Sequence, residues 1–361
     1  MTKKIKDFIL SANLLAGTII GAGVFSLPYV FKIAGVATGL FYLLLATVAY
    51  IAIYRMYAQV ISLTPSEHRL SGYIKIYLGN TAWWISILMT IVGAILVLTV
   101  YLILSQSFGN LITPFGSGED KMVIFWLLGS TAIFLSLRRI ALLEMMINIG
   151  MVAIIAIIFF LGLMKPDNLL SVNFGVHWGS FLLPLAPVLF SLSGRVAIPA
   201  MTKFGSLRAA INWGTIVPAV LFAAFVLSIL ALSPVVTEDA VTGLVGYVHP
   251  SILIVVGIFG MFSILSSYVT IGYDVYKSLG LDLGFPRFAQ YALVVFGPLV
   301  AYFAGLNSFI GLVSLIGGIF LGLEGIFIVL MWLKAIKKPL SLSTLLLIAV
   351  FAAAIIYEII K

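Results

Sequence analysis

The chain has 361 residues, of which 63% are hydrophobic and only 9% are charged. Soluble domains average roughly 45–50% apolar and about 25% charged residues, so this composition excludes a soluble protein and indicates an all-α, polytopic membrane protein. The chain contains no cysteine, and its three histidines lack the spacing of zinc ligands. Disulfides and thiolate metal sites are therefore excluded, and we expect no cofactor.

Eleven apolar segments approach the length of about 20 residues that a bilayer-spanning helix needs. They cover about 8–31, 35–62, 82–107, 121–137, 141–164, 179–202, 213–233, 251–277, 287–304, 307–333 and 340–360. The polar connection 63–81 contains a stretch at 71–77 that is expected to form a short surface helix. No linker or soluble domain interrupts the series, so residues 1–361 are predicted to form one transmembrane domain.

The Lys and Arg residues predict the orientation of the chain. With the N-terminus in the cytoplasm, 15 of the 20 Lys and Arg residues fall on cytoplasmic segments, as the positive-inside rule requires. The net charge of +8 thus reflects membrane topology and does not indicate a nucleic-acid partner. We expect a multi-pass protein of the cell membrane with the lipid bilayer as its surroundings; the sequence does not indicate an oligomeric state.

The first span combines apolar residues with helix breakers. Gly17, Gly21, Gly23 and Pro28 fall within twelve residues, although each interior glycine costs roughly 1 kcal/mol of helix stability relative to alanine and proline removes a backbone donor. Irregular backbone in a membrane is tolerated where it is buried in protein or lines a wet cavity. The pattern predicts a broken, ligand-binding helix, with close GxxxG packing of Gly17 and Gly21 as the alternative.

The sixth span carries a comparable set of breakers, namely Pro184, Pro187, Gly194 and Pro199. When Pro28 is aligned with Pro199, Gly23 coincides with Gly194, and the two spans run in opposite directions through the membrane. Interrupted spans at corresponding positions of two opposed halves are typical of inverted-repeat transporters. We therefore predict repeat one at about 8–164, repeat two at about 179–333 and an extra helix at about 340–360.

Two of these stretches resemble a known family. Gly17-Thr-Ile-Ile-Gly21-Ala-Gly23-Val-Phe-Ser-Leu-Pro28 resembles the first span, and Phe190-Ser-Leu-Ser-Gly-Arg-Val-Ala-Ile-Pro199 the sixth span, of amino acid permeases of the amino acid/auxin and hydroxy/aromatic amino acid types. The eighth-span stretch Ser266-Ser-Tyr-Val-Thr270 resembles them more loosely. These families belong to the amino acid–polyamine–organocation superfamily. The resemblance implies a leucine-transporter-like fold of five plus five inverted-repeat spans with an eleventh helix.

An amino acid needs partners for its carboxylate and its ammonium group. The outer half of the first span would present N–H groups near Ala22 and Gly23 to the carboxylate, and freed carbonyls would face the ammonium group. The candidate substrate-binding residues are Gly17, Thr18, Gly21, Ala22, Gly23, Tyr101, Phe190, Ser191, Ser193 and Gly194. Phe190 is expected either to form a wall of the pocket or to pack in the core.

The resemblance also implies a site for a sodium ion. It would combine the carbonyls of Gly17 and Ile20 with the hydroxyls of Ser263, Ser266 and Ser267. These serines have i, i+3 and i+4 spacing and share one helical face. The alternative is that they bond to their own helix or serve as small packing residues.

Arg195 lies near the centre of the sixth span, where aromatic permeases tend to carry histidine. An arginine at that depth costs roughly 2.5–3.5 kcal/mol on insertion scales and needs a partner or water. Glu324, at a similar depth on the tenth span, is the candidate partner. The two would form a static pair or a state-dependent clamp, Arg195 would replace the sodium ion, or Glu324 would carry a coupled proton. Asp274, nearer the cytoplasm, is expected to cap a helix or face water.

The sequence thus predicts a secondary active transporter for a neutral amino acid, with an aromatic amino acid as the narrower expectation. It would work by alternating access, with Na⁺ or H⁺ as the coupling ion. An amino-acid sensor on the same fold, such as a germinant-receptor subunit, is the alternative. No catalytic constellation or nucleotide motif predicts an enzyme, and no filter-like sequence predicts a channel.

Overall fold

The computed structural model describes residues 3–361 except 134–136, 166–171, 173, 205–206 and 282. Within those residues the chain folds into helices and irregular connections, with no strand. The first half contains α1 (Lys3–Ile19), η1 (Ala22–Ser26), α2 (Leu27–Ala34), α3 (Val36–Leu63), α4 (Leu70–Leu78), α5 (Asn80–Ile112), α6 (Gly118–Ala132) and α7 (Leu137–Leu163).

The second half contains η2 (Trp178–Ser180), α9 (Leu185–Ser191), η3 (Arg195–Ala197), α10 (Ile198–Met201), α11 (Leu207–Leu232), η4 (Thr242–Leu244), α12 (Pro250–Leu281), α13 (Arg287–Phe303), α14 (Phe309–Leu315), η5 (Ile316–Phe320), α15 (Leu321–Ala335) and α16 (Leu342–Ile360). Each of the eleven predicted segments coincides with one helix or with a group of consecutive helices. The end of the predicted span 121–137 includes residues 134–136, which lie outside the described residues.

By length and composition, six helices of the described chain can cross a membrane. They are α3, α5, α11, α12, the run from α14 to α15, and α16. The bent pair of α1 with η1 and α2 makes a seventh. Shorter apolar helices occupy Gly150–Leu163, Leu185–Met201 and Arg287–Phe303. The segment Leu185–Met201 contains an interruption between α9 and η3.

The first span is broken where its glycines predict. Helix α1 ends at Ile19, Gly21 has extended backbone angles, and η1 begins at Ala22. The two parts meet at 44°, and Pro28 lies in the first turn of α2, where its missing N–H group removes no helical hydrogen bond. The predicted break is confirmed but is narrower than expected, since Gly17 lies inside α1.

The sixth span is broken at the predicted residues as well. Helix α9 ends at Ser191, and the backbone at 192–194 is irregular before η3 and α10. The two breaks lie against each other, because a Cβ atom on Gly23 would overlap the backbone of Ser191. Similarly, a Cβ atom on Gly194 would collide with the side chains of Ile19 and Leu15. Glycine at these positions therefore permits the close approach of the two interrupted spans.

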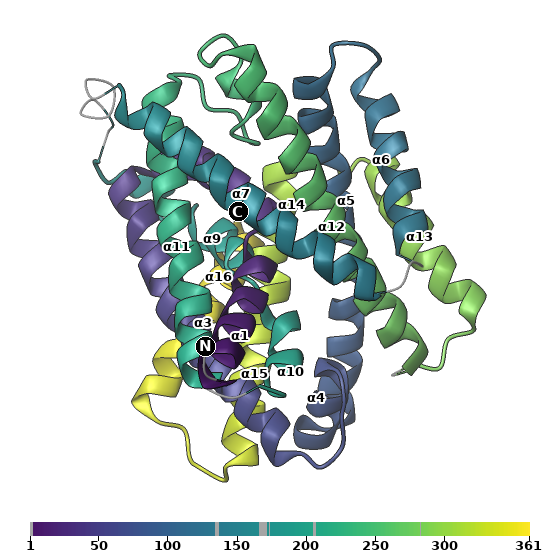
Figure 1. Cartoon of the computed structure of the whole chain (residues 1–361). Coiled ribbons are helices and arrows are strands. Elements are labelled where there is room, and N and C mark those ends of the chain that lie inside the picture. Colours follow the sequence, from purple (N-terminus) through teal and green to yellow (C-terminus); the bar gives the residue numbers. More distant parts are fainter. Residues whose placement is uncertain (1–2, 134–136, 166–171, 173, 205–206, 282) are drawn as a thin grey trace.

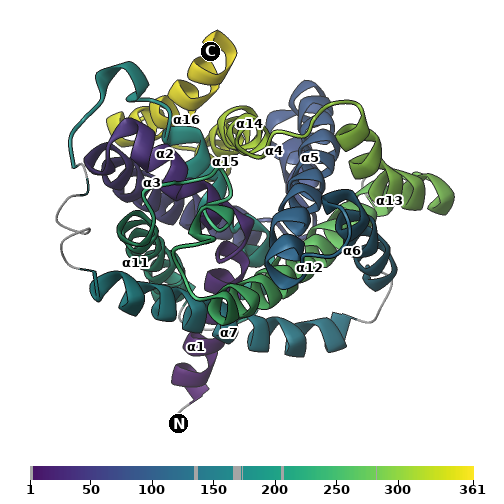
Figure 2. The ribbon, with the colours of Figure 1, turned by 90° about the horizontal axis from the view of Figure 1, so that it is seen from above.

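The other helices enclose this pair of broken spans. Helix α7 runs obliquely across α11 and α12, which lie side by side with it (Figure 1). Viewed from above, α5, α6, α12 and α13 gather on one side and α2, α3 and α11 on the other (Figure 2). Helix α16 lies at the periphery, with only 17% of its apolar 18-residue stretch buried inside the protein. The interrupted backbone is thus surrounded by protein, as irregular structure in a membrane requires.

Candidate functional site

A cavity of about 170 Å³ lies at the two breaks. One bound water needs roughly 10–15 Å³ of such a cavity, so there is room for about 11 to 17 water-sized spheres. That number is comparable to the heavy atoms of an aromatic amino acid. Most of the candidate residues line it: Thr18, Gly21, Ala22, Gly23, Tyr101, Phe190, Ser191, Ser193, Gly194, Arg195 and Glu324. Gly17 does not, because it lies one turn away within α1.

The breaks supply backbone groups to this cavity. The short helix η1 continues directly into α2, so Ala22 and Gly23 stand at the start of a helical run whose first N–H groups have no intrahelical acceptor. Helix α9 ends at Ser191, whose backbone lies against Gly23. The cavity is therefore bordered by a positive helix start and a negative helix end, which suit the carboxylate and the ammonium group of an amino acid.

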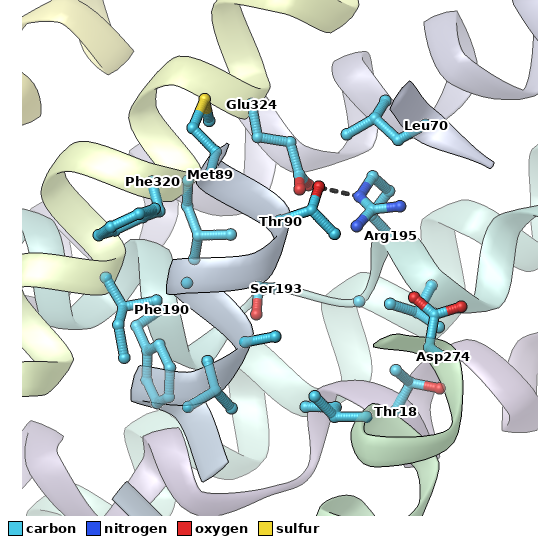
Figure 3. A pocket seen from close by; sticks show the side chains of 18 of the residues that line it. Thr18, Leu70, Met89, Thr90, Phe190, Ser193, Arg195, Asp274, Phe320 and Glu324 are labelled. Atoms are coloured by element: carbon cyan, nitrogen blue, oxygen red, sulfur yellow. Dashed lines mark ion pairs between the residues drawn. The ribbon is translucent and has the colours of Figure 1, made fainter. Parts of the chain in front are cut away.

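The hydroxyl groups at the breaks differ in their partners. Thr18 Oγ1 donates to the carbonyl of Leu14 at 2.8 Å, and Ser191 Oγ donates to that of Val188 at 2.9 Å. Both hydroxyl donors are thereby used within their own helices. Ser193 comes from the irregular stretch and points into the cavity in Figure 3.

Three members of two ion pairs, namely Arg195, Glu324 and Asp274, line the cavity. Arg195 Nε lies 2.8 Å from Glu324 Oε1, and the two side chains are only 17% and 14% exposed. The predicted pair is thus present. Arg69 pairs with Asp274, whose Oδ1 lies 2.9 Å away from Nη1. The expectation that Asp274 caps a helix is wrong, because it lies inside α12; its side chain lines the cavity and is 16% exposed.

The charged and aromatic residues occupy different ends of the cavity. Phe190 and Phe320 lie at one end, while Arg195 and Asp274 lie at the other, with Glu324 reaching Arg195 from α15 (Figure 3). Phe190 is buried against the core and also contributes to the wall, so both expectations for it hold. The site can therefore hold a molecule that has charged groups at one end and an apolar ring at the other.

Several lining residues were missed because they depend on contacts between distant segments. Helix α5 contributes Met89, Thr90 and Val97, and α12 contributes Thr270. Span ten contributes Phe320 through η5, a π-helical turn. Such turns occur frequently at functional sites. The adjacent glycines at 317 and 318 were an available signal, since a Cβ atom on Gly317 would overlap the carbonyl oxygen of Ala186.

Helix α4 also differs from its prediction. It is a short helix with Lys75 and Ile76 exposed, as expected, but its other face is buried. Leu70, Ser71, Tyr73 and Ile74 are buried, and Leu70 and Ile74 line the cavity. One apolar face of this polar connection is therefore part of the candidate site.

The predicted sodium ligands lie beside the cavity and not in its wall. Ser267 Oγ is 3.5 Å from the position that a Cβ atom on Gly21 would occupy, and the Tyr101 hydroxyl lies beside it. Ser263 is buried and Ser266 half-buried on the same face of α12. Ile20 lies at the break and Gly17 inside α1. The serine face is thus close to the first break, and its role as an ion site stays a prediction.

Comparison with known proteins identifies the family. Residues 4–341 match the model of the tryptophan/tyrosine permease family. The chain belongs to this family. This permease is therefore a secondary transporter, not an enzyme, and a multi-pass membrane protein. Comparison of its sequence with curated proteins found no match.

Solved structures share the fold of the permease at low sequence identity. The structure of MhsT in complex with L-phenylalanine aligns with a TM-score of 0.63 and 16% identity over 98% of this chain and 97% of that one. Mhp1, closed around bromovinylhydantoin, aligns with a TM-score of 0.59 and 15% identity over 98% and 91%.

A manganese transporter from Eremococcus coleocola aligns with a TM-score of 0.63 and 13% identity over 98% of this chain and 85% of that one. These likenesses confirm the predicted leucine-transporter fold.

Proposed function

We propose that the permease carries an aromatic amino acid across the cell membrane by alternating access, coupled to Na⁺ or H⁺. The observation that supports this most is the polarity of the cavity, which has the Arg195–Glu324 ion pair at one end and Phe190 and Phe320 at the other, with both helix breaks in its lining. The family name and the phenylalanine bound to MhsT agree with an aromatic substrate.

In this proposal the substrate's carboxylate binds the N–H groups at Ala22 and Gly23. Its ammonium group binds carbonyl oxygens at the end of α9, where the helix dipole is negative. The ring then packs between Phe190 and Phe320, since aromatic pairs contribute about 0.5–1.5 kcal/mol beyond the burial of their area. Tyr101 borders the same space.

Two places in the permease are candidates for coupling. The face of Ser263, Ser266 and Ser267 beside the first break would hold Na⁺ together with the carbonyls of Gly17 and Ile20. Glu324 would instead carry a proton, because burial of its carboxylate favours the protonated form, while Arg195 would be its partner when the proton is released. We also propose that the N-terminus is cytoplasmic, which follows from the 15 Lys and Arg residues on that side.

The test is uptake into proteoliposomes that contain the purified permease. Radiolabelled L-tryptophan, L-tyrosine and L-phenylalanine are compared with L-leucine and L-lysine, under an imposed Na⁺ gradient, an imposed pH gradient or neither. Protein-free liposomes with the same gradients are the control. We expect gradient-driven accumulation of at least one aromatic amino acid. Saturable binding without uptake would instead favour an amino-acid sensor, and no response to aromatic amino acids would overturn the proposed substrate class.

A further inference from the structure

Three tyrosines of α3 share one buried face. Tyr50, Tyr54 and Tyr57 are spaced by four and three residues, which places them on the same side of the helix, and each is at most 2% exposed. The rings of Tyr50 and Tyr54 lie 5.2 Å apart. Tyr50 and Tyr54 face the broken sixth span, so their hydroxyl groups meet backbone that has lost its helical partners.

Tyr54 bridges the break itself. Its hydroxyl donates to the carbonyl of Leu192 at 2.8 Å and accepts a short hydrogen bond from the N–H group of Gly194. One side chain thus satisfies an acceptor before Ser193 and a donor after it. Buried backbone groups need such partners, because leaving them unpaired inside a protein is costly.

The other two tyrosines carry the same hydroxyl group but make fewer hydrogen bonds. Tyr50 donates to the carbonyl of Leu189 at 2.6 Å, within the intact part of α9. The Tyr57 hydroxyl is buried and, among the described residues, has no hydrogen-bond partner. The three hydroxyl groups therefore make one, two and no bonds to the sixth span, although they come from one helix face and are buried alike.

We infer that Tyr54 is a positioning residue that presents Ser193 to the substrate. Its two bonds hold the backbone on both sides of Ser193, while the Ser193 side chain faces the cavity (Figure 3). Tyr54 itself does not line the cavity. It acts through residues 192–194, and α3 serves as the fixed support of the irregular stretch. The identity of the substrate in this inference rests on the proposed function.

The chain offers a direct test because it contains no cysteine. Ser193→Cys makes a single reactive thiol in the cavity, and its labelling by N-ethylmaleimide reports the exposure of this position. The rate is measured in membranes with and without L-tryptophan, L-tyrosine or L-phenylalanine. The same measurement is made after adding Tyr54→Phe, Tyr50→Phe or Tyr57→Phe, which each remove only a hydroxyl group.

We expect Tyr54→Phe to change the labelling rate without amino acid at least threefold. It should also raise the amino-acid concentration that gives half-maximal protection about tenfold. Tyr57→Phe should leave both values within twofold of the parent, and Tyr50→Phe should fall between. Equal rates and equal protection in the Tyr54→Phe and Tyr57→Phe backgrounds would overturn the inference.

A merely structural role is tested with a second variant. Replacing Tyr54 by 4-aminophenylalanine restores a hydrogen-bond donor at the para position, and it should return half-maximal protection to near the parent value. Protection that stays at the Tyr54→Phe level would contradict the positioning role of Tyr54. If no aromatic amino acid protects the thiol in the parent, the proposed substrate fails, but the labelling rates without amino acid still decide whether Tyr54 holds this segment.

Discussion

The energetic coupling between Arg195 and Glu324 can be measured, because a second ion pair of known partners lies beside them. Glu324 pairs with Arg195, and Asp274 pairs with Arg69. Asp274 also lies close enough to Arg195 to interact with it electrostatically. Glu324, Arg195 and Asp274 in the cavity wall, followed by Arg69 outside it, therefore alternate in charge. Removing any one of them leaves a different set of unpaired charges.

Removal of one partner of a buried pair typically costs about 3–5 kcal/mol, since the other charge remains without compensation. Arg195→Ala leaves two carboxylates on the wall, and Arg69 is near only one of them. We therefore expect the loss of unfolding free energy for Arg195→Ala to lie at the upper end of that range. Glu324→Ala leaves Arg195 with Asp274 nearby, and we expect a cost about 1 kcal/mol smaller. The double variant should cost no more than Arg195→Ala alone.

The free energy of unfolding of the four proteins, measured by SDS titration of the purified permease, gives the coupling between the two residues. We expect the double variant to fall short of additivity by at least about 2 kcal/mol, within the range measured for interacting residues. Arg195→Lys should restore only part of the loss, because lysine lacks the planar guanidinium group. Additivity to within about 0.5 kcal/mol would refute an energetically coupled pair.

Three further predictions concern transport. Glu324→Gln should retain exchange of substrate but lose pH-driven accumulation if Glu324 carries the coupled proton; normal accumulation in a pH-driven assay would exclude that role. Gly23→Ala should weaken aromatic amino-acid binding at least about tenfold, because its Cβ atom would overlap the Ser191 backbone. Gly179→Ala, with open space around it, is the matched control. The double variant Ser266→Ala with Ser267→Ala should reduce Na⁺-driven uptake more than it reduces the amount of expressed protein. Unchanged uptake would show that both serines are packing residues.

The break of each interrupted span was predictable because its cause is local. Glycine and proline weaken a helix through their own backbone, so their density at Gly21 and Gly194 indicated irregular structure before any tertiary contact was known. The membrane class and the number of apolar segments depend in the same way on composition and segment length. An arginine at the depth of Arg195 requires a partner, and Glu324 lies at a similar depth on the tenth span.

The remaining wall of the cavity depends on contacts between segments far apart in the sequence. Asp274 meets Arg69, which precedes α4, because α4 packs inward against α5 and α15, and Phe320 lines the cavity from the π-helical turn η5.

Tyr54 was not identifiable as a bridge, since an apolar span contains many tyrosines and only the approach of α3 to the sixth span selects this one. The amino-acid sequence by itself determined where the backbone must break. Packing between helices, which depends on non-local shape, decided which side chains meet at the breaks.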